Sequence, residues 1–261
     1  MLQKNVLEYL EGSAARFPDK LAFTDEGESF TFGRMLACAQ GLGTALANLS
    51  PRHNGPVAVL VDHTAANLTS FMGVLQSGNF YVPVDSQMPL PRMEAILETL
   101  NPVALVYTEA TRETAQAMAK FCPILEDHEG FAHPVDASLL ARRRSMVLDI
   151  DPVYAIFTSG STGTPKGVIT AHQSVMYYID AVTSVLGIGR EDVLGNQSPF
   201  DYIAAVRDIY IPLKTGASTV VIPKNEFAIP SQLFATLNRH KVTTLCWSVA
   251  GLELPAKFNE F

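Results

Sequence analysis

Short apolar runs alternate along the chain with segments whose apolar residues recur at helical spacing. The clearest unit begins with the run at 57–61, continues with helically spaced apolar positions over 68–75, and ends with a second run at 80–84. Gly78 lies just before that second run, and glycine accepts the left-handed backbone that ends many helices. The pattern therefore predicts a strand, a crossover helix and a parallel strand.

The same alternation predicts further elements along the rest of the chain. Strands are expected at 103–107, 154–158, 218–222 and 243–247, and helices around 111–121, 174–186 and 230–239. Strands that alternate with helices form mostly parallel sheets covered by those helices. We therefore predict an α/β fold of layered, mostly parallel sheets flanked by helices.

A polar stretch at 127–151 interrupts this alternation and contains three consecutive arginines, Arg142, Arg143 and Arg144. We interpret the stretch as a linker or surface excursion, and the arginines as a solvated face. A break near Asp151 then divides the chain into an N-terminal α/β lobe at 1–150 and a second lobe at 151–261.

Composition excludes several classes of protein. The 261 residues are 48% hydrophobic, enough to bury a core, and the formal net charge of -7 offers no basic field to a nucleic-acid backbone. The three cysteines are scattered, and no cluster has metal-ligand spacing, so no protein-bound metal is expected. No apolar run approaches the roughly 20 residues that cross a bilayer, and no export signal is present. We expect a cytoplasmic protein that binds neither nucleic acid nor membrane.

The most informative motif directly follows the predicted strand at 154–158. It reads T-S-G-S-T-G-T-P-K-G from Thr158 to Gly167. Glycines let backbone N–H groups turn toward one point, hydroxyl groups add donors, and a lysine adds a flexible cation. This combination suits phosphate oxygens, and the residues predicted to contact them are Thr158, Ser159, Gly160, Ser161, Thr162, Gly163, Thr164 and Lys166.

The order of residues in this motif differs from two common nucleotide loops. Pro165 precedes Lys166 and Gly167 follows it, which does not match G-x-x-x-x-G-K-[ST], and the dinucleotide pattern G-x-G-x-x-G is absent as well. A surface turn between a strand and a helix has a similar composition. The uninterrupted match after a strand favours a mobile grip for a polyphosphate.

These residues resemble the adenylate-forming, or AMP-binding, superfamily, which includes peptide-synthetase adenylation domains, acyl-CoA and aryl-CoA ligases and luciferases. The segment from Leu75 to Asp85, L-Q-S-G-N-F-Y-V-P-V-D, is similar to a family segment, and Phe30, Thr31 and Phe32 stand where the family has an early Tyr-Thr-Tyr signature. The resemblance covers nearly the whole chain. It implies the N-terminal part of a peptide-synthetase-type adenylation domain.

The resemblance implies a ligase that uses ATP and Mg²⁺. A substrate carboxylate would attack the α-phosphorus of ATP, which gives an acyl adenylate and pyrophosphate, and the loop would close over the β- and γ-phosphates. Catalysis of such a transfer consists mainly of positioning and charge neutralisation. The acyl group would pass to the phosphopantetheine thiol of a carrier protein. An acyl- or aryl-CoA ligase and a non-catalytic nucleotide-binding module are the alternatives.

Relative to the family, the sequence covers about half of the usual length. It lacks the later acidic motif that holds Mg²⁺ and adenine, the aspartate that holds the ribose, and the mobile C-terminal domain with the catalytic lysine. Lys166 is not that lysine. We therefore expect a truncated chain that has no complete catalytic set and is inactive by itself.

The segment 197–217 resembles the family stretch that begins the acid-binding pocket. Amino-acid-activating members carry a Phe-Asp pair there, whose aspartate pairs with the substrate ammonium, and Phe200 and Asp201 form such a pair. Counting back without gaps from Thr215, however, places Tyr202 and Ile203 on the pair. Two residues rotate a helical side chain by roughly half a circle, so the two registers exclude each other. We favour the register with Ile203.

An apolar Ile203 would leave a buried ammonium unpaired, which is costly. The favoured register therefore predicts an aryl, hydroxy or keto acid, whereas Asp201 in the pocket would predict an amino acid. The same register places Ala204, Arg207 and Cys246 on pocket-lining positions. Arg207 would pair with a polar substrate substituent, with Asp208, or with solvent.

Three further side chains have structural interpretations that we prefer to catalytic ones. Cys246 on a predicted strand is expected to be a small buried hydrophobe and not a nucleophile. His172 is expected to cap backbone groups and not to act as a general base. Trp247, like Tyr202, would line the acid pocket or belong to the core, and the core is the commoner place for an aromatic side chain.

Overall fold

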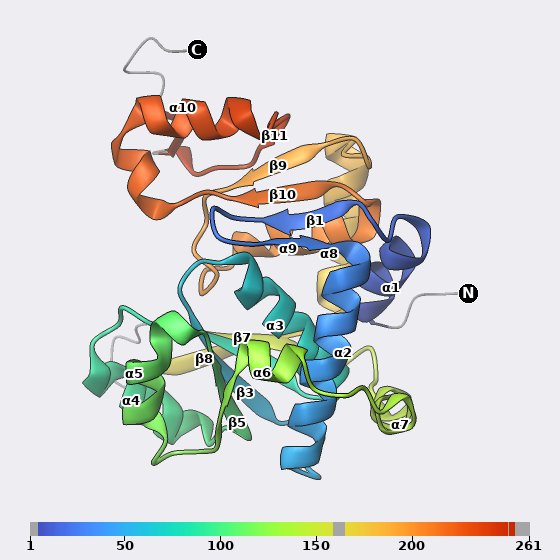
Figure 1. Cartoon of the computed structure of the whole chain (residues 1–261), viewed down its shortest axis with the longest axis vertical. Coiled ribbons are helices and arrows are strands. Elements are labelled where there is room, and N and C mark those ends of the chain that lie inside the picture. Colours follow the sequence, from blue (N-terminus) through green and yellow to red (C-terminus); the bar gives the residue numbers. More distant parts are fainter. Residues whose placement is uncertain (1–4, 159–164, 250, 254–261) are drawn as a thin grey trace.

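The computed structural model describes residues 5–158, 165–249 and 251–253, and its strands form two sheets (Figure 1). The five-stranded sheet has the strand order β11-β9-β10-β1-β2, and the six-stranded sheet has the order β6-β5-β3-β4-β7-β8. All pairings are parallel except the two at β2 and β8, which run antiparallel to β1 and β7. The mostly parallel, layered α/β fold predicted from the sequence is confirmed.

The strands of the five-stranded sheet are β1 (Leu21–Thr24), β2 (Ser29–Thr31), β9 (Val193–Asn196), β10 (Ser218–Val221) and β11 (Thr244–Leu245). Those of the six-stranded sheet are β3 (Pro56–Val61), β4 (Phe80–Asp85), β5 (Ala104–Tyr107), β6 (Ile124–Glu126), β7 (Pro152–Thr158) and β8 (Lys166–Ala171). Each sheet takes strands from both sides of residue 150. The division into lobes at 1–150 and 151–261 therefore does not coincide with the two sheets, and it stays a prediction.

The helices cover the sheets and fill the space between them. They are α1 (Leu7–Arg16), α2 (Phe32–Leu49), α3 (Ala65–Gln76), α4 (Leu90–Leu100), α5 (Arg112–Met118), α6 (Asp127–Phe131), α7 (Ala137–Met146), α8 (His172–Leu186), α9 (Ala205–Thr215) and α10 (Pro230–Arg239), with short 3-10 turns at Glu109–Thr111 and Lys224–Ala228. No helix in the described part of the chain is both long and apolar enough to cross a bilayer.

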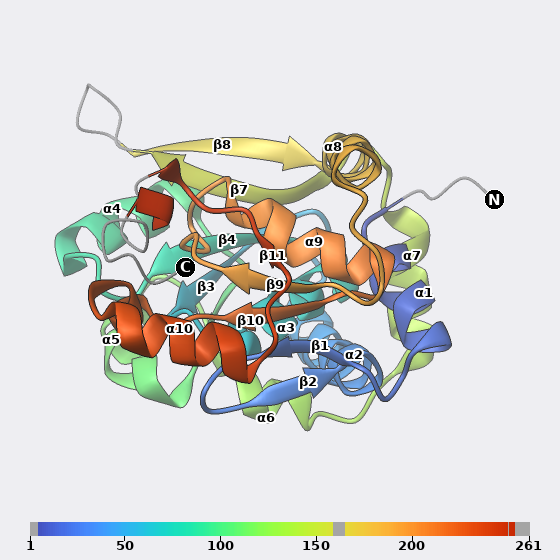
Figure 2. The same cartoon turned by 90° about the horizontal axis from the view of Figure 1, so that it is seen from above.

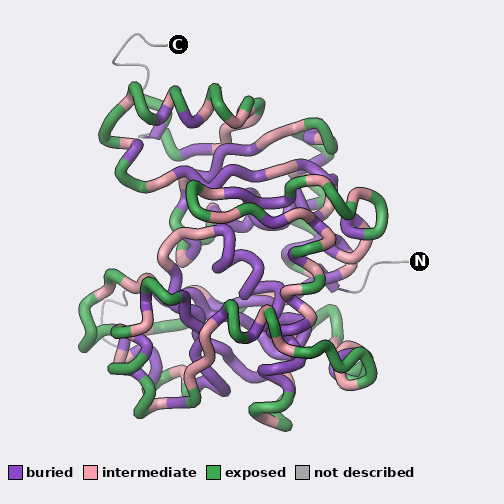
Figure 3. The backbone as a smooth tube through the Cα atoms, viewed as in Figure 1, coloured by how far each residue is buried: buried purple, intermediate pink, exposed green. Residues whose placement is uncertain are grey.

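Helix α3 lies at the centre of the molecule, between the two sheets (Figure 3). Every one of its residues is buried, including the polar Asn67, Thr69, Ser70 and Gln76. Two glycines allow α2 and α3 to pack closely: a Cβ added at Gly43 would lie 2.6 Å from Gln76 Cβ, and one at Gly73 would lie 2.6 Å from Leu42 Cδ2. One large hydrophobic cluster therefore joins the two sheets through α3.

Strand β4 carries a proline although it lies between two neighbours. Pro83 is aligned with Val59 of β3, whereas β7 is registered with β4 only at Tyr81 and Tyr154. Proline lacks the N–H that a central strand donates to both sides. Because the registered pairing of β4 with β7 is limited to Tyr81 and Tyr154, β7 does not require an N–H from Pro83.

Strand β8 was not expected from the sequence. Residues 166–171 read K-G-V-I-T-A, and the first four are exposed. Val168 and Ile169 have exposed fractions of 58% and 61%. The segment lacks the alternation of apolar and polar residues that predicts a half-buried strand. Pairing with β7 forms it.

The segment 127–151 is mostly a surface excursion, as one of the two interpretations expected, and Arg142 is exposed. The interpretation of the arginines as a solvated face is wrong for Arg143 and Arg144. The segment contains α6 and α7, and Arg143 is 6% exposed. Its guanidinium donates to four main-chain carbonyls in the last turn of α2 and just after it, those of Ala47, Ser50, Pro51 and Arg52, at 2.7–3.0 Å. Arg144 pairs with Glu11 at 3.3 Å. Arg143 thus satisfies the unpaired carbonyls at a helix end, a role that only folding reveals.

Candidate active site

The predicted phosphate motif lies on a hairpin at the edge of the six-stranded sheet. Thr158 ends β7, Lys166 begins β8, and the two residues are registered opposite each other with exposed side chains. The six predicted contacts between them, Ser159, Gly160, Ser161, Thr162, Gly163 and Thr164, lie outside the described residues. Strand β7 runs parallel to β4, so the motif leaves the sheet at its carboxyl edge, where ligands of open α/β sheets bind.

A cavity of about 430 Å³, here called the acidic cavity, lies where the carboxyl ends of both sheets meet. It is lined by residues that follow strands of either sheet, namely Asp25, Glu26, Gly27, Asp62, His63, Thr64, Asp85, Ser86, Gln87, Val221, Pro223, Lys224 and Asn225. Lys224 Nζ is 3.8 Å from Asp85 Oδ2. Most of the lining residues are polar, and the acidic ones outnumber the basic ones.

The carboxylates of the acidic cavity hold the surrounding loops in place. Asp25 accepts the backbone N–H groups of Gly27, Glu28 and Ala65 at 2.6–2.7 Å. Asp62 accepts the hydroxyls of Thr64 and Thr108 at 3.0 and 2.7 Å. Carboxylates that already accept such bonds are fixed in position, so they form a rigid wall.

His63 lines the acidic cavity and remains neutral in spite of its acidic neighbours. Its ring lies against Phe200, with 4.6 Å between ring centroids. Burial lowers the pKa of His63 from its ordinary value of 6.5 to about 4, Lys224 contributes, and Asp85 and Asp25 oppose the shift. Desolvation of the imidazolium outweighs the attraction of the carboxylates.

A second cavity of about 440 Å³, here called the apolar cavity, lies among β7, β8, α8 and the start of α9. In Figure 2, β8 and α8 lie along one side of the molecule, and α9 lies next to them. The lining residues are Tyr154, Thr170, Ser174, Val175, Tyr178, Ile203, Ala204, Val206 and Arg207. No carboxylate belongs to this lining among the described residues.

Three of the predicted acid-pocket residues, Ile203, Ala204 and Arg207, line the apolar cavity together. A fourth joins them through the backbone, because Arg207 Nη2 donates to the carbonyl of Cys246 at 2.9 Å. Burial raises the pKa of the Cys246 thiol, which agrees with the expectation that it is no nucleophile. The first turn of α9 and the residue that follows β11 are thus brought together, 39 residues apart in the chain.

The remaining two predicted residues, Asp201 and Tyr202, do not line the apolar cavity. The Tyr202 side chain is 59% exposed. Burial raises the pKa of Asp201, nearby Asp85 adds to the effect, and Lys224 and Arg92 oppose it. These charged neighbours place Asp201 on the side of the acidic cavity. Ile203 lines the apolar cavity with a side chain that is 53% exposed, and the choice between the two registers stays a prediction.

Arg207 does not form an ion pair with its neighbour Asp208. The Asp208 carboxylate accepts from Asn196 Nδ2 at 2.7 Å, and its side chain is 2% exposed. Burial raises the pKa of Asp208 to about 7, which weakens any electrostatic neutralisation of Arg207. Arg207 Nε is buried and has no hydrogen-bond acceptor among the described residues.

The sequence analysis missed several residues of the apolar cavity. Tyr154 and Thr170 are paired across β7 and β8, and Ser174, Val175 and Tyr178 stand on the first turns of α8. The i, i+4 spacing of Ser174 and Tyr178 indicates one helix face. No short-range pattern in the sequence indicates that this helix face packs against α9.

The structural interpretations of His172 and Trp247 agree with their contacts. His172 begins α8, is 2% exposed, and accepts the Val6 N–H at Nδ1 over 3.3 Å. Trp247 is 8% exposed and donates to the Gly195 carbonyl at 2.7 Å. Its ring packs edge-on against Phe227 in a small core cluster. Neither side chain lines either cavity.

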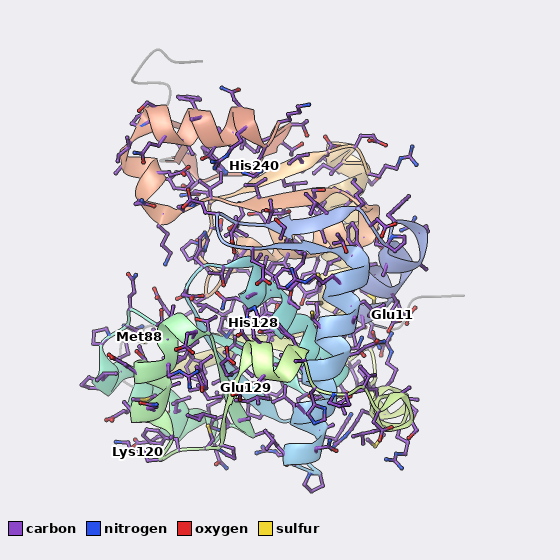
Figure 4. The ribbon with its side chains drawn as sticks, in the orientation of Figure 1. Glu11, Met88, Lys120, His128, Glu129 and His240 are labelled. Atoms are coloured by element: carbon purple, nitrogen blue, oxygen red, sulfur yellow. The ribbon has the colours of Figure 1, made fainter. Side chains whose placement is uncertain are left out.

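One cluster with metal-ligating atoms was not anticipated. Glu126, Asp127 and His128 bring ligand atoms within 4.8 Å of one another at the start of α6, where Figure 4 labels His128. The His128 ring already has two carboxylate partners, Asp127 at 2.8 Å and Glu28 at 3.1 Å. The ring therefore connects α6 to the turn between β1 and β2, and we assign no metal to it.

Comparison with known proteins agrees with this geometry. The AMP-binding enzyme family matches residues 10–254. Surfactin synthase subunit 1 of Bacillus subtilis (strain 168) is 28% identical over 260 residues, which is 98% of this chain and 7% of that protein. The D-alanine–D-alanyl carrier protein ligase of Lactiplantibacillus plantarum is 29% identical over 237 residues, which is 90% of this chain and 45% of that ligase. The chain spans less than half the length of these curated relatives.

Solved structures give the same result for the fold. The nonribosomal peptide synthetase FmoA3 with bound alpha-methyl-L-serine-AMP has a TM-score of 0.88 at 25% identity, covering 98% of this chain and 28% of that one. VinN in complex with L-aspartate has a TM-score of 0.77 at 19% identity, covering 94% of this chain and 68% of that one. The layered sheets are those of nonribosomal peptide synthetase adenylation domains, and the chain belongs to the AMP-binding enzyme family.

Proposed function

We propose that this chain supplies the nucleotide-tail site and the first walls of the acid pocket of a carboxylate–AMP ligase. The membership of the AMP-binding enzyme family supports the use of ATP. The carboxyl edge of the six-stranded sheet would bring the nucleotide to the same side of the molecule as the predicted acid-binding segment. The product would be an acyl adenylate.

The observation that carries the proposal is the pairing of Thr158 with Lys166 at the open end of the β7–β8 hairpin. Both side chains are exposed. A hydroxyl and a flexible cation thus stand on either side of a turn rich in glycines and hydroxyls. We propose that Thr158, Ser159, Gly160, Ser161, Thr162, Gly163, Thr164 and Lys166 hold the β- and γ-phosphates.

The reaction would begin when an oxygen of the substrate carboxylate attacks the α-phosphorus of ATP. The new acyl–phosphate bond forms as the bond to the β-phosphate oxygen breaks, and pyrophosphate leaves with Mg²⁺. The protein would contribute position and positive charge. Ile203, Ala204, Arg207 and Cys246 would border the acid, while Asp201 and Tyr202 would lie outside its pocket.

We propose a carrier-protein phosphopantetheine thiol as the acceptor of the acyl group. Curated relatives named D-alanine–D-alanyl carrier protein ligase support this choice, as do the peptide synthetases. Free CoA remains the alternative acceptor. Thioester formation with a carrier protein but not with CoA would separate them.

Binding of ATP and AMP to the chain tests the nucleotide site. Lys166→Met is expected to weaken ATP binding about tenfold, since one charge-assisted contact is lost, and to leave AMP binding unchanged because AMP lacks the outer phosphates. The matched control is Lys241→Met, at an exposed position that precedes β11 and so lies at the opposite, amino end of the parallel strands. Isothermal titration calorimetry measures all three proteins. An equal effect of Lys166→Met on ATP and AMP would contradict the proposal.

Turnover is a separate measurement. The chain spans 45% of the D-alanine–D-alanyl carrier protein ligase that it matches. We propose that the chemical step needs groups beyond these residues, so that pyrophosphate exchange by the chain alone is negligible. Exchange at the rate of a full-length relative would contradict this.

A further inference from the structure

We propose that Asp127, His128 and Glu28, here called the clasp, form a proton-dependent contact that holds the turn between β1 and β2 against the start of α6 (Figure 4). The clasp is closed while the His128 ring carries two protons, and its link to the turn opens when one of them leaves. The turn supplies three residues to the lining of the acidic cavity, Asp25, Glu26 and Gly27. The inference therefore concerns a wall of that cavity, and it is independent of the proposed function.

Each nitrogen of the His128 ring lies beside a carboxylate oxygen. Nδ1 is 2.8 Å from Asp127 Oδ1, and Nε2 is 3.1 Å from Glu28 Oε2. A neutral imidazole has a single N–H, whereas the imidazolium has two. Only the protonated ring therefore donates to both carboxylates. The contact to Asp127 lies within α6, and the contact to Glu28 joins two segments that are 100 residues apart in the chain.

Asp127 depends on the ring more than Glu28 does. The Asp127 side chain is 1% exposed, against 24% for Glu28, and its Oδ2 is buried without a hydrogen-bond partner among the described residues. Glu28 has a second cation, because Arg34 of α2 pairs with its Oε1. A buried carboxylate that loses its charge partner is strongly destabilised. When the ring holds one proton, we therefore expect Nδ1 to keep it for Asp127, so that the link to Glu28 is the one that opens.

The pKa values of the pair give the direction of the pH dependence. Burial lowers the pKa of His128, but the hydrogen bonds and charges of Asp127 and Glu28 outweigh burial and raise it above the ordinary 6.5. Burial raises the pKa of Asp127 to about 6, and His128 opposes that shift. Between pH 6 and the pKa of His128 both partners are mainly charged. As the pH rises through the folded pKa of His128, the stabilisation that the imidazolium contributes is lost.

The other charged and titratable groups around the clasp lie on β6 and α2. Glu126 at the end of β6 adds to the raised pKa of Asp127 through its negative charge. Arg34 of α2 keeps its charge at neutral and moderately basic pH. Burial raises the pKa of the Cys38 thiol on α2 above its ordinary 9, although Arg34 opposes the shift. His128 is therefore the group of this cluster that we expect to change charge between pH 6.5 and 8.5.

Opening of the clasp should loosen the turn without detaching it from the rest of the protein. Asp25 Oδ2 still accepts the Ala65 N–H at 2.6 Å, at the first residue of α3. The turn thus stays attached to α3 while it loses its contact to α6. We therefore expect a local change in the wall of the acidic cavity and not global unfolding.

Hydrogen–deuterium exchange of the turn tests the clasp on the chain as it is, once the intrinsic pH dependence of exchange is divided out. Between pH 6.5 and 8.5 we expect the protection of residues 25–29 to fall at least about threefold, as for a partly exposed ion pair. The NMR signal of the His128 ring gives its pKa, which Glu28→Gln should lower because a charge is removed. A His128 pKa at or below 6.5 in the unmodified protein would overturn the inference, and so would one that Glu28→Gln leaves unchanged.

Three variants assign the change in protection to the ring. His128→Gln removes the titrating group, and we expect a weakly protected turn whose protection is equal at the two pH values. His128→Arg carries a cation at both and is expected to keep the turn protected at pH 8.5. His133→Gln, at a ring that contacts the Pro134 carbonyl, is the matched control and should behave as the unmodified protein does. Urea unfolding verifies that each variant is folded, and a threefold loss of protection in folded His128→Gln would show that another group operates the turn.

Discussion

The acidic cavity and the apolar cavity have nearly equal volumes, about 430 and 440 Å³, but opposite chemistry. The first is walled by carboxylates that follow β1, β3 and β4, and the second by tyrosines, aliphatic side chains and one arginine. The short segment from Phe200 to Arg207 lines the apolar cavity with its later residues, and its Phe200 packs against His63 of the acidic cavity. Asp201 lies toward the acidic cavity, and Ile203 lies in the apolar one. The direction of each side chain from this segment therefore decides which cavity holds a charge.

The anchor of that segment is Phe200, and its removal should have the largest effect. Phe200 is 3% exposed and lies between His63 and Phe71. We expect Phe200→Ala to lower the free energy of unfolding by about 3–5 kcal/mol, because a large buried aromatic leaves a cavity. Tyr202→Ala, at a side chain that is 59% exposed, should change it by no more than about 0.5 kcal/mol. Urea denaturation compares the two, and equal losses would show that Phe200 is not the anchor.

The neutral His63 in the acidic cavity predicts a dependence of stability on pH. Its folded pKa of about 4 lies below the ordinary 6.5, so the folded state binds fewer protons between these values. Stability is then lost as pH falls from 6.5 to 4, by at most about 1.4 kcal/mol per unit from this residue. His63→Asn should remove that contribution, and asparagine tolerates the φ of 68°.

Urea midpoints of the unmodified protein and His63→Asn at pH 7 and pH 4.5 measure the effect. The difference between the two proteins isolates His63 from other groups that titrate in this range, such as His172, whose pKa burial also lowers. If carboxylates dominated the acidic cavity, the histidine would be stabilised as a cation, and His63→Asn would instead be relatively more stable at pH 7.

A carboxylate moved into the apolar cavity should make the two cavities more alike. Ala204 lines the apolar cavity just before the first residue of α9. We expect Ala204→Asp to shift the Kd ratio of leucine to 4-methyl-2-oxopentanoate about tenfold toward leucine, because a charge-assisted pair becomes available. Asp201→Asn is the matched change on the other side and should leave that ratio unaltered. A ratio that responds to Asp201→Asn alone would place Asp201 in the acid pocket.

Much of the fold was predictable because local patterns carry it. The apolar runs that became β3, β4, β5, β7 and β10 were recognised as strands, and the predicted helix at 174–186 corresponds to α8. Strand β11 is shorter than expected, at two residues. Strand β8 was not predicted, because its exposed residues show neither the two-residue apolar repeat of a strand nor the 3.6-residue repeat of a helix. Pairing with β7, and not propensity, makes it a strand.

Part of the candidate site was likewise predictable from the sequence, and part was not. The composition of the motif from Thr158 to Gly167 marked it as a phosphate loop without any coordinates, and the segment before α9 was expected to contribute Ile203, Ala204 and Arg207. Tyr154, Thr170 and Tyr178 could not be assigned, because nothing in the sequence states which helix face meets which strand. Arg143 was misread for the same reason, since its carbonyl partners lie more than 90 residues away.

By itself the sequence determined the alternation of strands and helices and predicted a phosphate-binding loop, because both rest on residues close together in the chain. Only the tertiary structure decided that Asp201 lies toward Asp85 and Lys224, and that Arg207 is held by the Cys246 carbonyl. Burial and charge pairing depend on partners distant in sequence, and these partners set the character of each cavity.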